Sequence, residues 1–167
     1  TLPFTFTLQG LSYTEVMVDA NGFVSLGSTP ISDSSQSKCL SNQDGPGAAI
    51  YGWWADLDPS QPGAHVSTFQ PAADRFVVEF DNVPAAAKSR LDYVVNFQIV
   101  LYRNGDIKLN FGSLPNVQYQ PPPVTVGVEA RDGLFYNQIA CKDGRTELGY
   151  LPASFQSFYL AAKESVH

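Results

Sequence analysis

Carboxylates are the residues of this chain with the clearest capacity for chemistry, because other reactive groups are scarce. His65 is the only histidine away from the C-terminus, and no Gly-x-Ser-x-Gly elbow, phosphate-binding loop or dinucleotide fingerprint occurs. Glu79 and Glu129 occupy polar positions of alternating segments, and two carboxylates across a concave sheet could act as an acid and a nucleophile. A solvated face of an antiparallel sheet produces the same pattern without any catalytic role.

A set of polar residues on neighbouring predicted strands is expected to share one face with these carboxylates. The set is Glu79, Asn96, Gln98, Lys108, Asn110 and Glu129. If the face is concave, the sequence allows a small secreted hydrolase, either a glycosidase or an acid peptidase, that uses Glu79 and Glu129. If the face is open to water, it is a binding or solvent-exposed surface.

Asp56 and Asp58 form a second candidate site at the end of a nearly continuous apolar segment. Their i, i+2 spacing places both carboxylates on one face of a strand end, where they could hold Ca²⁺ if carbonyl groups and a third acid converge. The alternative is capping of the turn at Pro59, because aspartate before proline commonly ends a strand. Beyond this possible calcium site, no cofactor is expected.

Trp53 and Trp54 are adjacent, so on a strand their side chains should point to opposite faces. One interpretation is that both fill layers of a core. The other is an aromatic platform for a sugar ring, which with Asp56 and Asp58 would make the chain a carbohydrate-binding module. Tyr102 and Tyr119 are further aromatic residues expected on the surface, and Tyr102 joins Trp53 and Trp54 as a candidate ligand-binding residue.

Cys39 and Cys141 are the only cysteines. The low share of charged residues, 16%, is typical of secreted proteins and favours a disulfide over two buried free thiols. In the chain-entropy model, closing a loop of about 100 residues stabilises the fold by about 4.7 kcal/mol. The bridge would tether the segment 27–47, which shows no periodicity, to a late strand.

The elements that must position these residues are short strands. Between residues 93 and 111, large apolar residues alternate with polar ones on both sides of Asn104-Gly105, which predicts a hairpin with a type I′ turn. Further strands are expected over 4–8, 13–20, 23–26, 64–70, 75–83, 124–129, 134–142 and 155–162, and the nearly continuous apolar segment 48–57 is expected to be a strand covered on both faces. Further turns are expected at Asn21-Gly22, Asp132-Gly133 and Asp143-Gly144. About ten strands in this arrangement predict an all-β antiparallel sandwich or jelly roll.

Length and charge restrict the organisation and the partners. The 167 residues predict one domain over 1–167, either a mature secreted chain or a domain excised from a larger secreted protein. The net charge of −6 leaves no basic patch that could bind nucleic acid or an anionic membrane surface. The sequence contains no run of 18 apolar residues, so we expect no membrane insertion.

The order of the turn and core motifs resembles the nidogen-type (NIDO) extracellular domain. The motifs include Asn21-Gly22-Phe23-Val24-Ser25-Leu26-Gly27, Tyr51-Gly52-Trp53-Trp54-Ala55-Asp56-Leu57-Asp58, Phe97-Gln98-Ile99-Val100-Leu101-Tyr102-Arg103-Asn104-Gly105 and Thr125-Val126-Gly127-Val128-Glu129, within residues 3 to 131. The chain is also similar to accessory β-sandwich modules of secreted bacterial proteases. The resemblance implies a non-catalytic extracellular module for adhesion, dimerisation or substrate docking, with a protein or a glycan as partner.

Overall fold

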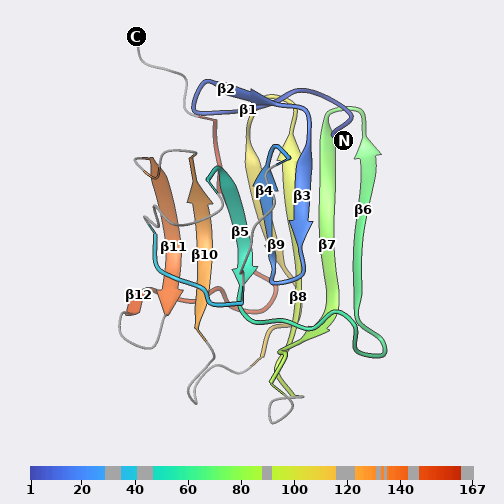
Figure 1. Cartoon of the computed structure of the whole chain (residues 1–167), viewed down its shortest axis with the longest axis vertical. Helices are drawn as coiled ribbons and strands as arrows, with labels where there is room; N and C mark the ends of the chain where they lie inside the picture. Colours follow the sequence, from blue (N-terminus) through green and yellow to red (C-terminus); the bar gives the residue numbers. More distant parts are fainter. Residues whose placement is uncertain are drawn as a thin grey trace.

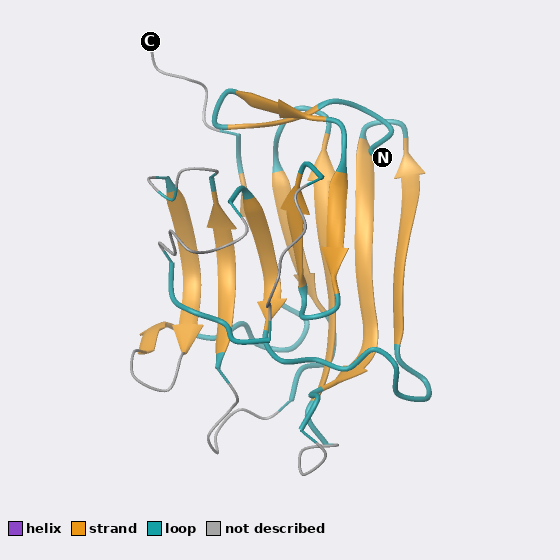
Figure 2. Cartoon of the chain, in the orientation of Figure 1, coloured by secondary structure: helices purple, strands orange, loops and turns teal. Residues whose placement is uncertain are grey.

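The structure, a computed structural model, describes residues 1–28, 35–40, 47–87, 92–115, 123–130, 133, 135–142 and 147–162. All regular secondary structure in these residues is β-strand (Figure 2). The strands are β1 (Phe6–Leu8), β2 (Leu11–Tyr13), β3 (Val16–Asp19), β4 (Phe23–Leu26), β5 (Ala49–Trp54), β6 (His65–Ala72), β7 (Arg75–Pro84), β8 (Val94–Tyr102), β9 (Ile107–Phe111), β10 (Val124–Glu129), β11 (Tyr136–Lys142), β12 (Glu147–Gly149) and β13 (Ser157–Leu160). The described residues contain no helix with the length and apolar character needed to cross a membrane.

Two antiparallel sheets form the sandwich. One has six strands in the order β12-β11-β10-β5-β4-β3, and the other has five in the order β13-β9-β8-β7-β6. The β1-β2 hairpin lies across one end of the two layers (Figure 1). The predicted all-β sandwich is therefore confirmed.

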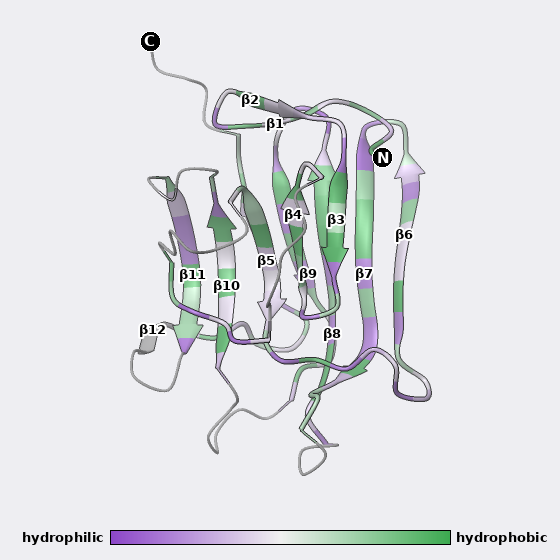
Figure 3. Cartoon of the chain, in the orientation of Figure 1, coloured by the Kyte–Doolittle hydropathy of each residue, from purple (hydrophilic) through white to green (hydrophobic). Residues whose placement is uncertain are grey.

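The core between the sheets is built from the inward positions that alternation predicts. Ile99, Leu101 and Leu109 of the β8-β9 hairpin are fully buried, and the ring of Phe97 stacks on Phe80 with centroids 4.6 Å apart. On the facing sheet, a Cβ at Gly52 would lie 2.4 Å from the Phe97 ring, so only glycine fits there. Figure 3 shows the same alternation along β10, where green hydrophobic residues alternate with paler residues of near-neutral hydropathy.

The two Asn-Gly turns differ from the predicted type I′. Only their glycines, Gly22 and Gly105, have positive φ, at 88° and 91°. In the second turn the Gly105 N–H donates to the Tyr102 carbonyl over 2.9 Å, so the loop has three residues and ends in a glycine bulge. Two consecutive positive-φ residues occur instead at Gln9-Gly10, between β1 and β2. The turns expected at Asp132-Gly133 and Asp143-Gly144 involve residues outside the described ones.

The segment 35–40 covers the outer face of the six-stranded sheet. The predicted disulfide is present, with the Cα atoms of Cys39 and Cys141 5.4 Å apart. Two hydrogen bonds flank it: Thr125 Oγ1 donates to the Lys38 carbonyl over 2.8 Å, and the Leu40 N–H donates to Gln138 Oε1 over 2.7 Å. As a result β10, predicted to be buried on one face, is buried on both.

Strand β13 completes the five-stranded sheet and is held to the β8-β9 turn by Asp106. This carboxylate is 8% exposed and accepts hydrogen bonds from Tyr159 Oη, from the Ala162 N–H over 2.6 Å and from Asn104 Nδ2 over 2.8 Å. The bond from Tyr159 is the largest cause, followed by that from Ala162, of a pKa of Asp106 below its usual range. The Asp106 carboxylate therefore stabilises the fold most in its ionised form.

Substituting Asp106→Asn should lower the free energy of unfolding by about 1.5 to 3 kcal/mol near neutral pH, the usual contribution of hydrogen bonds to a charged group. Because the folded-state pKa of Asp106 is lowered, its contribution is complete above the unfolded pKa of about 3.9 and is lost as pH falls through the lower folded value. Urea denaturation across this range should show the wild type and the variant converging in acid. Asp56→Asn, at an exposed site, is the control. A difference that is constant with pH would contradict this role of Asp106.

Candidate functional site

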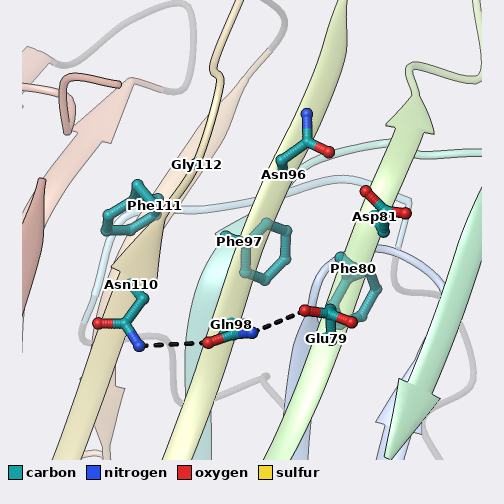
Figure 4. A pocket seen from close by; sticks show the side chains of 9 residues that line it. All are labelled: Glu79, Phe80, Asp81, Asn96, Phe97, Gln98, Asn110, Phe111 and Gly112. Atoms are coloured by element: carbon teal, nitrogen blue, oxygen red, sulfur yellow. Dashed lines mark hydrogen bonds between the residues drawn. The ribbon is translucent and has the colours of Figure 1, made fainter. Parts of the chain in front are cut away.

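A row of polar side chains crosses the outer face of the five-stranded sheet. The register places Ser67, Glu79, Gln98, Asn110 and Ser157 opposite one another on the five strands. Three hydrogen bonds link four of them: Gln98 Nε2 to Glu79 Oε1 (2.6 Å), Asn110 Nδ2 to Gln98 Oε1 (3.3 Å) and Ser157 Oγ to Asn110 Oδ1 (2.9 Å). Figure 4 shows the first two bonds. We call these five residues the polar row.

A depression of about 260 Å³ adjoins the polar row. Asp81, Asn96 and Gly112 line it together with three members of the row, Glu79, Gln98 and Asn110 (Figure 4). Backbone irregularity shapes it, because the β7-β8 register shifts between Phe80 and Val83. The side chain of Asn96 fastens this irregularity, accepting from the Asn82 N–H over 2.8 Å and donating to the Ser113 carbonyl over 3.0 Å.

Aromatic side chains lie at both ends of this surface. Beyond one side of the row, the rings of Tyr102 and Tyr159 are 6.1 Å apart, and the Arg75 guanidinium lies 5.4 Å from the Tyr102 ring centroid. At the other end Phe155 is 82% exposed and has a φ of 64°, which bulky side chains rarely adopt. Its N–H donates over 3.0 Å to the carbonyl of Gly112, which lines the depression.

A comparison of the sequence with protein-family models supports the resemblance found in the motifs. A model described as NIDO related matches residues 1–147, most of the 167 residues. The chain belongs to the NIDO-related family. No curated protein sequence and no solved structure matches it. Within this NIDO-related domain, the matched segment includes both disulfide cysteines, whereas Phe155 and β13 lie beyond its end.

The fold places the two predicted carboxylates on different sheets. Glu79 is half-buried on β7, in the polar row, whereas Glu129 is on β10 of the six-stranded sheet and is 1% exposed. The Tyr51 hydroxyl donates to Glu129 Oε2 over 3.1 Å, and burial, followed by the charge of Glu129, raises the pKa of Tyr51 well above its usual range. The expectation that both glutamates share one polar face is wrong, because the segment 35–40 turns the outer side of β10 into interior.

The two tryptophans point to opposite faces, as expected, but neither ring is available to a sugar. Trp53 is fully buried between the sheets and donates from Nε1 to the Tyr93 hydroxyl over 3.0 Å. Trp54 is 3% exposed and stacks on Tyr51, with centroids 4.9 Å apart, on the side covered by the segment 35–40. Both tryptophans therefore fill core layers, and the alternative interpretation, an aromatic platform for a sugar ring, is wrong. Tyr102 is half-buried on the outer face, and Tyr119 lies outside the described residues.

Asp58 caps the turn that follows β5. Its Oδ1 accepts hydrogen bonds from the Ser60 hydroxyl (2.6 Å) and the Ser60 N–H (3.0 Å), and its Oδ2 accepts one from Gln61 Nε2. The hydroxyl of Ser60, then the amide of Gln61, lowers the pKa of Asp58. Asp56 is exposed, and the described residues contain no group of three or more histidines, cysteines or acids placed to hold a metal. The contacts of Asp58 favour the capping role.

Strand alternation correctly places Glu79, Gln98 and Asn110 on one polar face, but no residue pattern indicates the exposed Phe155 or the depression. Phe155 was expected to begin a closing strand, whereas β13 begins at Ser157. The exposure of Phe155 depends on a turn in which the Gln156 N–H donates to the Ala153 carbonyl. The residues of this segment contain no pattern that predicts such a turn. The polarity of Asn96 was visible in the sequence, but its two backbone contacts were not.

Replacing Cys39 and Cys141 together by alanine should lower the free energy of unfolding by about 2 to 5 kcal/mol. It should also loosen the segment 35–40 and expose Trp54 to acrylamide, while Trp53 stays shielded between the sheets. Fluorescence quenching of Trp53→Phe and Trp54→Phe variants, each with and without the cysteines, separates the two rings. Equal protection of Trp54 after removal of the bridge would show that the disulfide does not hold this cover in place.

Proposed function

We propose that this NIDO-related domain is a non-catalytic extracellular interaction module that holds a partner on the outer face of its five-stranded sheet. The observation that carries the proposal is the hydrogen-bonded polar row beside a depression, with an exposed aromatic side chain on either side of the row, Tyr159 on one and Phe155 on the other. Adhesion, dimerisation and docking of a substrate would all use such a face. The Cys39–Cys141 disulfide supports an oxidising, extracellular setting.

Preorganisation favours binding at this face. Gln98 is fixed by Glu79 on one side and by Asn110 on the other, so little rotamer freedom remains to be lost when a partner docks. The row stands on paired strands of a sheet, which positions side chains more accurately than a loop does. Exposed tyrosine and phenylalanine near polar groups are the composition expected of a recognition surface.

Catalysis asks for more than the face provides. Hydrolysis needs a nucleophile or an activated water together with a tuned acid or base. With Glu129 buried in the other sheet, the carboxylates beside the depression are Glu79 and Asp81. His65 is exposed on β6, opposite Asp81 in register, and no cysteine of the described residues is free. A hydrolase would therefore have to work with Glu79 and Asp81, with His65 beside Asp81.

The test is a comparison of variants on arrays of extracellular proteins and glycans, using the folded chain. Combined Gln98→Ala and Asn110→Ala should abolish the binding seen with the wild type, because both amides are then removed from the face. Asn137→Ala is the matched control, since this exposed asparagine is on β11 of the other sheet. Binding that survives the double substitution would overturn the proposed surface.

A parallel assay addresses catalysis. The wild type should turn over neither polysaccharides nor unfolded protein between about pH 3 and about pH 8, the range in which carboxylates act as acids and bases. Glu79→Gln combined with Asp81→Asn is the companion variant. Turnover by the wild type that disappears in this variant would favour a hydrolase over a binding module.

A further inference from the structure

We propose that the polar row binds a neutral, linear glycan that runs across the strands. The inference rests on the proposed function of this face and adds the class of partner. It starts from the direction of the row, which is perpendicular to the strands because its members are register neighbours. Neighbouring strands are about 4.8 Å apart, so the row offers one polar group at each such step. An extended chain of hexoses repeats at a comparable length.

The hydrogen-bonding capacity of the row matches sugar hydroxyls. A primary amide has two N–H donors and two acceptor lone pairs. Gln98 uses one donor on Glu79 and one lone pair on Asn110, and Asn110 uses one donor on Gln98 and one lone pair on Ser157. Each amide therefore keeps one donor and one acceptor for a ligand. A pair of vicinal hydroxyls, each able to donate and accept, complements such an amide.

The charge of the face selects against acidic polysaccharides. Glu79 and Asp81 stand at the depression, and the whole chain carries a net charge of −6. Lys108 lies in the next row of the outer face, and Arg75 forms an ion pair with Asp74. Like-charge repulsion would weaken sulfated or uronic acid chains, whereas a neutral glycan meets no such penalty.

The distribution of aromatic rings favours a glycan over a protein. Protein interfaces concentrate aromatic anchors at the centre of the contact and surround them with polar groups. Here the order is reversed: amides occupy the centre, and the rings lie to either side of the row, with Tyr102 and Tyr159 on one side and Phe155 on the other. Rings beside a polar track can stack on the apolar faces of sugars while the track binds their hydroxyls. The exposed Phe155, held at positive φ beside Gly112, is the residue otherwise without a role.

The experiment is titration calorimetry with soluble neutral polysaccharides, namely a β-1,3-glucan, a β-1,4-xylan and a mannan, beside the acidic polymer alginate. The wild type should bind at least one neutral polymer, and the affinity should change little between low and high salt because no ion pair is involved. Gln98→Ala and Asn110→Ala should each weaken binding about tenfold or more, the scale of one well-formed hydrogen bond. Phe155→Ala should weaken it with an unchanged melting temperature, and Asn137→Ala should leave it unchanged.

The outcomes separate the two proposals. Binding to a neutral glycan that is insensitive to Gln98→Ala and Asn110→Ala, or binding to alginate alone, overturns the glycan assignment. Row-dependent binding of an extracellular protein, with no polysaccharide bound, overturns the glycan assignment but leaves the interaction module standing. Absence of row-dependent binding to any polymer or protein overturns both. If a row variant fails to fold, Phe155→Ala, which changes an exposed side chain, still decides the matter.

Discussion

The rest of the structure depends on burial of the inward side chains of β8 and β9 against the six-stranded sheet. Ile99, Leu101 and Leu109 are fully buried there, and Gly52 gives the Phe97 ring room to approach the opposing backbone. Since side chains alternate strictly along a strand, burying this face fixes which residues point away from it. The outward position of Gln98 and its register with Asn110 are consequences of core packing and need no separate cause.

The two outer faces of the sandwich differ in exposure, because the disulfide holds a covering segment over one of them. On the six-stranded sheet, Cys39 and Cys141 hold a segment over Tyr51 and Trp54, so that face becomes a second small core. Glu129 is buried together with them and accepts a hydrogen bond from the Tyr51 hydroxyl. Among the described residues, the five-stranded sheet has no comparable cover over the polar row. The polar row of this sheet therefore stays accessible on a rigid base.

Residue patterns predict the structure correctly where a single periodicity determines it. Alternation predicted the sandwich, the inward residues of β8 and β9, and the opposite directions of Trp53 and Trp54. It failed where a distant segment changes the environment, as for Glu129, whose position in β10 alternates normally but whose outer side is covered by residues about 90 positions earlier. It also failed for turn type, because a three-residue loop with Gly105 in a bulge keeps the same strand alternation as a type I′ turn.

The match between this face and a ligand is a property of register more than of any single residue. Gln98 bonds to both Glu79 and Asn110 because the β7-β8 and β8-β9 pairings place all three in one line. A shift of one residue in either hairpin would turn the amides inward and break the line, at the cost of exposing large apolar groups. Hydrophobic burial of the inward side chains beneath the row therefore provides the free energy that keeps the row aligned. A binding surface supported in this way can change its side chains without weakening the fold, provided that the inward positions stay apolar.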